Sequence, residues 1–90
     1  MTSEPFDPAT RWELDPKVAL RPEPFGALAY HYGTRRLTFL RSKLLADVVA
    51  GLGGYDSAGA AIEDRVPAPS RPAYERALAS LARSEFIRAC

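Results

Sequence analysis

The sequence predicts an α+β fold in which a three-stranded antiparallel sheet is followed by three helices. Up to about Leu40, apolar residues alternate with polar or small ones, which is typical of strands. From Ser42 onward they recur about every three or four residues, which is typical of amphipathic helices. A chain of 90 residues has room for one domain. We therefore expect a flexible segment over residues 1–11 and a single domain over residues 12–90.

The first strand of the sheet is expected over residues 17–21, where Val18 and Leu20 lie on one face. Pro22 is expected to end this strand, because proline has no N–H to donate to a neighbouring strand. Further upstream, residues 12–14 also alternate and are the first that we expect to enter the fold. The residues before them are polar and include two prolines, which favours disorder.

The next two strands are predicted to form a hairpin. They span Gly26–Tyr32 and Arg35–Leu40, and the loop between them is Gly33-Thr34. A two-residue loop with glycine first is typical of a type II′ turn, in which that glycine has a positive φ. Because the loop is so short, its length also determines which residues of the two strands lie opposite each other.

The register of this hairpin predicts two distinct faces. Tyr30 lies opposite Leu37 and Leu28 lies opposite Phe39, so these four large side chains share one face. The other face is small and polar and is expected to contact solvent. Its residues are Ala27, Ala29, His31, Arg36 and Thr38.

Three helices are expected after the hairpin. Ser42 is suited to cap the first, whose apolar stripe ends at Gly53-Gly54. A short second helix is expected from Ser57 to about Asp64. The third follows a proline-bearing loop and has Pro72 in its first turn, where a helix tolerates proline. Three strands followed by three helices resemble a winged helix-turn-helix domain.

Composition argues against catalysis and against a metal centre. The chain has one histidine, His31, and one cysteine, Cys90, which is its last residue. A zinc site needs several converging ligands, and a nucleophilic cysteine needs an activating base. We therefore expect no enzyme activity and no cofactor, and an ordinary surface position for His31.

Charge is concentrated in one part of the chain. The net charge is only +1, but residues 24–46 contain no acid and four bases, namely Arg35, Arg36, Arg41 and Lys43. Three interpretations are open: the bases protect an edge strand from aggregation, attract an acidic extended peptide, or bind nucleic acid. The low net charge disfavours nucleic acid, whose binding depends on many phosphate contacts.

Nothing in the sequence predicts a membrane or export segment. No apolar run reaches the roughly 18 residues that a membrane-spanning helix needs. The first seven residues include Glu4 and Asp7 and lack the basic start and apolar stretch of a signal peptide. The expected location is the cytoplasm.

Two stretches resemble a known family, the mycofactocin precursor-peptide chaperones (MftB). The first covers residues 18–28 (VALRPEPFGAL) and 30–40 (YHYGTRRLTFL). The second, Tyr74–Ile87, resembles the last helix of that family and of the broader PqqD-like peptide-recognition domains. With the helices between them, the resemblance covers about residues 12–88. One departure is Ser84-Glu85, where such domains usually have a glycine that ends the helix.

The resemblance implies a non-catalytic role for residues 12–90 as a peptide-recognition domain. Such domains bind the leader of a ribosomally made precursor peptide (MftA-like) and present it to a radical S-adenosylmethionine enzyme (MftC-like). The leader adds as a strand beside the third strand of the sheet and packs against the last helix. The leader-binding residues implied in this chain are Arg35, Arg36, Leu37, Thr38, Phe39 and Leu40 of the strand, with Tyr74, Ala77, Leu78 and Leu81 of the helix.

Two other functions remain open from the residues themselves. A winged-helix protein could bind DNA, but the last helix is largely alanine and leucine. Its bases, Arg71, Arg76 and Arg83, are offset by Glu75 and Glu85. The chain could also form a homodimer by pairing its open strand with a second copy. For the helix residues, a plain core role competes with a role in lining a groove.

Overall fold

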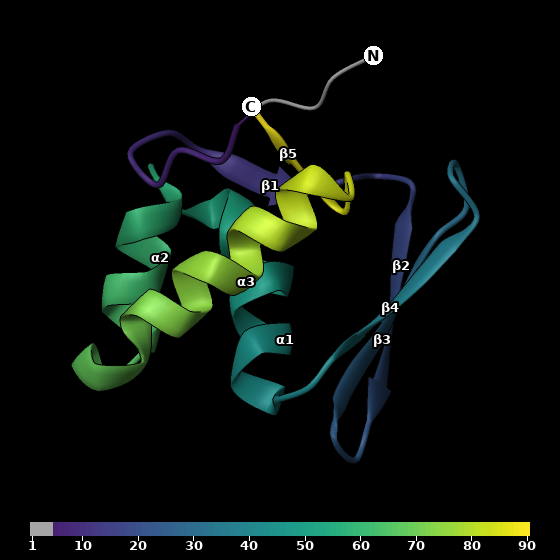
Figure 1. Ribbon diagram of the computed structural model, residues 1–90, viewed down its shortest axis with the longest axis horizontal. Helices are drawn as coiled ribbons and strands as arrows, with labels where there is room; N and C mark the ends of the chain where they lie inside the picture. Colours follow the sequence, from purple (N-terminus) through teal and green to yellow (C-terminus); the bar gives the residue numbers. More distant parts are fainter. Residues whose placement is uncertain (1–4) are drawn as a thin grey trace.

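The computed structural model describes residues 5–90 and confirms the α+β fold (Figure 1). The three-stranded antiparallel sheet has the order β2–β3–β4 and consists of β2 (Val18–Glu23), β3 (Gly26–His31) and β4 (Arg36–Leu40). Three α-helices follow it, namely α1 (Lys43–Gly51), α2 (Ala58–Arg65) and α3 (Arg71–Arg83). Two 3-10 turns, η1 (Leu52–Gly54) and η2 (Ala68–Ser70), precede α2 and α3. In space, α1 lies between the sheet and α2 (Figure 1).

A second, two-stranded sheet joins the two ends of the domain and is absent from the sequence prediction. It pairs β1 (Trp12–Leu14) with β5 (Ile87–Ala89) in antiparallel fashion. Arg88 of β5 forms an ion pair with Glu13 of β1 at 2.7 Å, and the hydrogen bond between them raises the pKa of the arginine. Strands of three residues are too short to show a periodic pattern, which explains why β5 was missed.

The segment before β1 contacts the start of α2. Of the predicted flexible segment, residues 1–4 lie outside the described part of the chain. Further along, the carbonyls of Pro8 and Thr10 accept hydrogen bonds from the N–H groups of Gly59 and Ala58, at 2.8 and 2.9 Å. These are N–H groups of the first helical turn, which have no partner inside the helix.

The register of the predicted hairpin is confirmed, but the turn type is wrong. Tyr30 pairs with Leu37, as expected, yet the strands end at His31 and Arg36, which leaves a four-residue loop. The non-glycine residue Arg35 has the positive φ, at 62°, and Gly33 does not. Instead, Nδ1 of His31 accepts hydrogen bonds from the N–H groups of Gly33 and Thr34, both at 3.1 Å. A side chain therefore shapes this turn.

The predicted orientation of the sheet is also wrong. Ala27, Ala29 and His31, expected at the surface, are all buried, and α1 packs against β3 on this side. Leu37 and Phe39 are instead exposed on the opposite face. The physical reason is size, because alanines let a helix approach the backbone of a strand closely, whereas four large side chains would hold it away.

His31 is therefore a buried structural residue and not a surface one. Besides its contacts to the turn, its ring meets the ring of Phe86 edge-on, with 5.8 Å between centroids. Its Nε2 lies 3.9 Å from Oδ1 of Asp15. The side chain thus connects β3 with its own hairpin turn, with the β1–β2 loop and with the segment between α3 and β5.

Strand β2 runs through Pro22 instead of stopping there. The strand tolerates proline because, among residues 5–90, β3 is its one neighbour in the sheet. A two-residue turn, Pro24-Phe25, then leads to Gly26, whose φ is 153°. A Cβ at this position would lie 2.1 Å from the carbonyl oxygen of Leu40, so glycine is needed where β3 meets the end of β4.

The three helices begin where the sequence predicts. The Oγ atoms of Ser42 and Ser57 accept hydrogen bonds from the third residues of α1 and α2, at 2.9 and 3.1 Å. At the end of α3, Glu85 has a φ of 65°, and the Phe86 N–H donates to the Leu81 carbonyl at 2.9 Å. Glu85 therefore has the left-handed conformation that a helix-ending glycine usually supplies.

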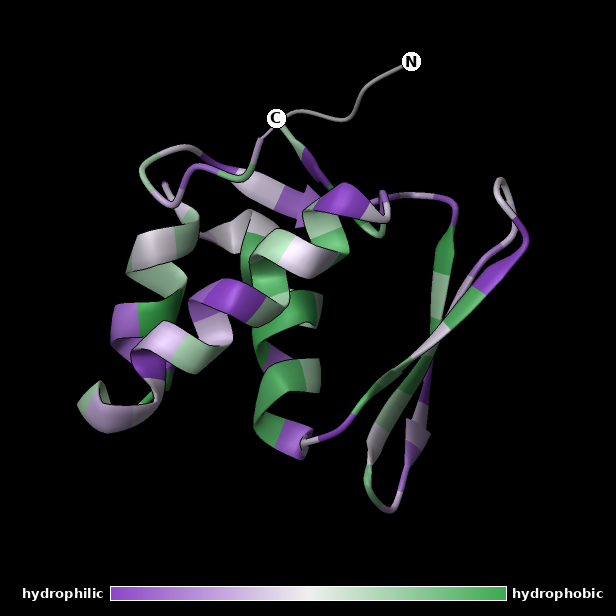
Figure 2. Ribbon diagram, viewed as in Figure 1, coloured by the Kyte–Doolittle hydropathy of each residue, from purple (hydrophilic) through white to green (hydrophobic). Residues whose placement is uncertain are grey.

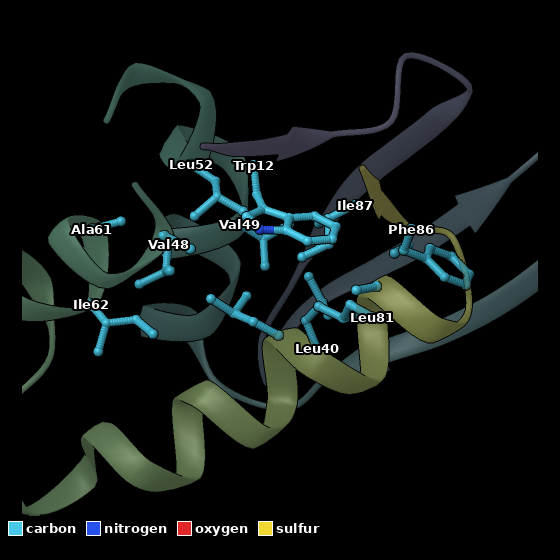
Figure 3. Packing of buried hydrophobic residues seen from close by; sticks show 14 of the residues in the cluster. Trp12, Leu40, Val48, Val49, Leu52, Ala61, Ile62, Leu81, Phe86 and Ile87 are labelled. Atoms are coloured by element: carbon cyan, nitrogen blue, oxygen red, sulfur yellow. The ribbon is translucent and has the colours of Figure 1, made fainter. Parts of the chain in front are cut away.

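The hydrophobic core lies between the helices and the inner face of the sheet. Figure 3 shows that β4, α1 and α3 contribute to it together with Trp12 of β1. Leu40 is the large core residue of β4, and Leu81 of α3 belongs to the same cluster. The core therefore holds the last helix in place relative to the end of β4.

Candidate peptide-binding site

The three-stranded sheet has two edges, and they differ in their capacity to accept another strand. Strand β2 contains Pro22, which lacks an N–H group. Strand β4 contains no proline, and β3 is its one partner within the described residues. Apart from the Arg36 N–H, which donates to Oγ1 of Thr34 at 3.3 Å, no β4 backbone group bonds outside the sheet in residues 5–90. The edge of β4 is therefore open for strand addition.

The side chains of β4 alternate between the two faces of the sheet. Leu37 and Phe39 point to the outer face, away from the helices, and are exposed. Arg36, Thr38 and Leu40 belong to the inner face, where exposure falls along the strand from exposed through half-buried to buried. A strand added beside β4 would alternate in the same way, so its side chains would reach both faces.

The predicted residues of α3 occupy different depths. Leu78 and Leu81 are buried in the core, whereas Tyr74 and Ala77 are half-buried and reach the surface of the helix. The hydroxyl of Tyr74 shares a hydrogen bond of 3.0 Å with Oγ of Ser42, the residue that caps α1. This bond ties α3 to the segment that follows β4.

The structure thus brings some of the predicted site residues together and separates others. Leu40 and Leu81 share the core, and Tyr74 reaches the end of the segment after β4. Leu37 and Phe39, in contrast, lie on the other face of the sheet from Leu40. The sequence pattern did not predict this separation, because it indicated the wrong face of the sheet as the solvent-exposed one.

Four basic side chains surround β4 without acidic partners. Arg35, Arg36, Arg41 and Lys43 are all exposed, and none forms an ion pair in the described part of the chain. Arg65, whose pKa is raised by its hydrogen bond to Tyr55, belongs to α2 and not to this group. The four bases therefore create a positive potential around the strand that an acidic partner could neutralise.

Two hollows in the surface were not expected from the sequence. The larger, of about 530 Å³, lies between α1 and the β2–β3 hairpin and is lined by Pro22, Ala27 and Lys43, among others. The smaller, of about 360 Å³, lies at the tip of the β3–β4 hairpin, beside His31 and Arg88. Neither is lined by a β4 residue. Both form between segments distant in sequence, so no local motif marks them.

Within residues 5–90, no three histidine, cysteine, aspartate or glutamate side chains are grouped so that they could hold a metal ion. Cys90 is an exposed free thiol. The helices of the described residues are all too short or too polar to cross a membrane.

Comparison with known proteins identifies the family. The sequence model of the peptide chaperone MftB family matches residues 11–88, a range that includes both β4 and α3. The chain belongs to this family. No solved structure matches the chain.

Three relatives carry the name "peptide chaperone MftB". The protein from Mycobacterium tuberculosis (strain H37Rv) is 43% identical over an alignment of 90 positions, which covers 94% of this chain and 79% of that protein. The one from Mycobacterium ulcerans is 41% identical over an alignment of 87 positions, which covers 91% of this chain and 76% of that protein. The match to the protein from Mycolicibacterium smegmatis is 49% identical over 57 residues, which are 63% of this chain and 56% of the relative.

Proposed function

We propose that this chain is a peptide chaperone that binds the leader of the mycofactocin precursor peptide and presents it to a radical S-adenosylmethionine enzyme. The observation that carries the proposal is the open edge of β4, in a chain of the peptide chaperone family. In this proposal, residues 12–90 are the peptide-recognition domain. The domain performs no chemistry and needs no cofactor, and it acts in the cytoplasm, where ribosomes make the precursor.

The leader adds to the sheet as a fourth strand beside β4. About five backbone hydrogen bonds, each worth a net 0.5–1.5 kcal/mol, supply only a few kcal/mol. Micromolar binding requires about 8 kcal/mol after the loss of translational and conformational entropy. Side chains of the leader must therefore contribute much of the affinity.

On the inner side, these leader side chains pack between β4 and α3. Thr38, Tyr74 and Ala77 are half-buried, so each still has surface that a bound peptide can cover. Leu40, Leu78 and Leu81 are already buried, and in this proposal they support the binding surface from below. The distinction predicts that the half-buried residues govern affinity, whereas the buried ones govern stability.

The four exposed bases favour an acidic leader. Opposite charges on two binding partners mainly raise the association rate and fix their relative orientation, and salt weakens both effects. A leader that combines acidic residues with aliphatic ones would match the bases around β4 and the apolar surface beside α3. DNA binding has less support, because α3 exposes Glu75 beside Arg76.

The test is a titration of labelled leader peptide with the full chain. Binding should be submillimolar, and Arg36→Glu should weaken it at least fivefold at low salt. Arg76→Glu is the matched control, because it reverses an exposed charge outside the four bases. If the leader does not bind, the proposed function is wrong.

A second titration tests strand addition itself. In an added strand, the N–H groups of alternate leader residues point toward β4 and the others point away. Methylating every second backbone nitrogen should abolish binding for one of the two alternating sets and leave it within about threefold for the other. Equal loss with both sets would rule out strand addition.

A further inference from the structure

The outer face of the sheet exposes large apolar side chains that the helices do not cover. The exposed fractions are 42% for Phe25, 37% for Tyr30, 56% for Tyr32, 52% for Leu37 and 53% for Phe39. Leu28 lies among them and is half-buried. We refer to these six residues as the outer patch. Figure 2 shows that hydrophobic residues occur along the strands of the sheet as well as along α1.

The outer patch is one continuous surface. The rings of Phe25 and Phe39 meet edge-on with 5.8 Å between centroids, and the rings of Tyr30 and Tyr32 are 6.3 Å apart. Cross-strand pairing places Leu28 opposite Phe39 and Tyr30 opposite Leu37. The patch therefore extends over β3 and β4 without interruption and reaches the open edge of β4.

On the β2 side the same face becomes polar. Arg21 and Glu23 of β2 lie on it and form an ion pair at 3.4 Å. The apolar surface is thus bounded on one side, at β2, and open on the other, at β4. Any molecule that lies beside β4 also borders the outer patch.

The size of the outer patch limits what can bind to it alone. A large side chain has about 200 Å² to bury, so the five exposed fractions correspond to roughly 500 Å². This is near the upper range of apolar patches on monomers, which often have a function. A stable interface needs about 800 Å² from each partner, so a second copy on this patch alone would give a weak dimer.

Leader binding would enlarge this face. In an antiparallel or parallel strand added to β4, every second side chain points to the outer face of the sheet. These side chains would continue the outer patch beyond Leu37 and Phe39. The resulting surface combines chaperone and leader, and only a partner that must recognise both would need it.

We propose that the outer patch is the docking surface for the enzyme that modifies the peptide, and that this enzyme binds the patch and the leader strand as one apolar face. This inference rests on the proposed function and specifies which surface of the chaperone meets its partner. The exposed Arg35 at the hairpin tip favours acidic residues at the rim of the partner's surface.

The experiment uses the double variant Phe25→Ser/Tyr30→Ser. Neither residue lies on β4 or on α3, so the variant keeps the β4 backbone and the α3 side chains to which the leader is proposed to bind. The matched control is Ala19→Ser, an exposed residue on the outer face of β2 beyond the patch. Affinity for the leader and affinity of the purified modifying enzyme for the chaperone are both measured, the latter with and without leader.

The double variant should bind the leader within threefold of the original chain and melt within a few degrees of it. The enzyme's affinity for the leader-bound complex should fall at least tenfold, and the control should match the original chain. Unchanged enzyme affinity in the double variant overturns the inference, whether or not the leader binds. Failure of the leader to bind overturns the proposed function instead. The enzyme's affinity for the leader-free chain, compared between the original chain and the double variant, then decides whether the enzyme docks on the outer patch.

The oligomeric state distinguishes docking of the enzyme from the other possible occupant of the outer patch, a second copy of the chain. Sedimentation of the original chain at several concentrations should show a monomer without leader. A stable dimer that the double variant abolishes would assign the outer patch to a second copy of the chain and overturn the docking of the enzyme.

Discussion

In the three-stranded sheet, the face with small side chains is buried and the face with large apolar side chains is exposed, whereas large apolar side chains are usually the buried ones. The inner face, which packs on α1, is built around Ala27 and Ala29, whereas the outer face carries Tyr30, Leu37 and Phe39. A face is buried when a helix can come close to it, and small side chains allow that approach. Large apolar residues that remain outside then need another explanation, and docking of a partner supplies one.

The largest effect should come from comparing two consecutive residues of β4. Leu40 is 2% exposed and Phe39 is 53% exposed. Leu40→Ala should lower the free energy of unfolding by about 2–5 kcal/mol, since it leaves a cavity in the core. Phe39→Ala should lower it by less than about 1 kcal/mol, because that ring is already exposed on the outer face and its removal leaves no cavity in the core. Urea denaturation of both variants measures the difference, and equal losses would show that the two faces are not distinct.

A slightly smaller effect is expected from enlarging the inner face. Ala29 is 1% exposed and lies on the side of β3 that α1 covers. Ala29→Leu should cost about 1–3 kcal/mol, because extra methyl groups force the helix away from the strand. Ala19→Leu, on the outer face of β2, is the control and should change stability by no more than about 0.5 kcal/mol. Thermal unfolding followed by circular dichroism would detect the contrast.

The order of the elements could be predicted because the hydrophobic period changes near Ser42 and because serine and proline mark the helix starts. The hairpin register could also be predicted, since loop length constrains it even though the turn type differed. Which face of the sheet is buried could not be predicted. The alternating pattern separates two faces, but it does not say which face a later helix will cover.

The candidate site shows the same limit. The choice of β4 and α3 follows from the family resemblance, and the structure adds why β4 is the better edge, since Pro22 interrupts the other one. Sequence reasoning grouped Leu37 with Leu78, whereas three-dimensional packing puts the first outside and the second in the core. Depth depends on contacts between distant segments, which no local pattern contains.

His31 provides a further test of the inner face, because it is a polar residue that is buried there. Its Nδ1 accepts two hydrogen bonds from the hairpin turn, and its ring contacts Phe86. His31→Ala should lower the free energy of unfolding by about 1–2 kcal/mol through loss of these bonds. Amide exchange at Gly33 and Thr34 should accelerate at the same time. Unchanged exchange would mean that the side chain does not hold the turn, whatever the loss of stability.

The smallest effect concerns the turn that places Phe86 against the inner-face histidine. Glu85 adopts a φ of 65°, which costs a residue with a Cβ about 1 kcal/mol more than glycine. Glu85→Gly should therefore raise the free energy of unfolding by up to about 1 kcal/mol. Glu75→Gly, inside α3, is the matched control and should lower it by a similar amount, because glycine is a poor helix residue. Opposite signs for the two glycines in the same urea titration would establish that the backbone, and not the lost carboxylate, determines the change. If Glu85→Gly lowers the free energy of unfolding instead, the carboxylate of Glu85 stabilises the fold by more than the positive φ destabilises it.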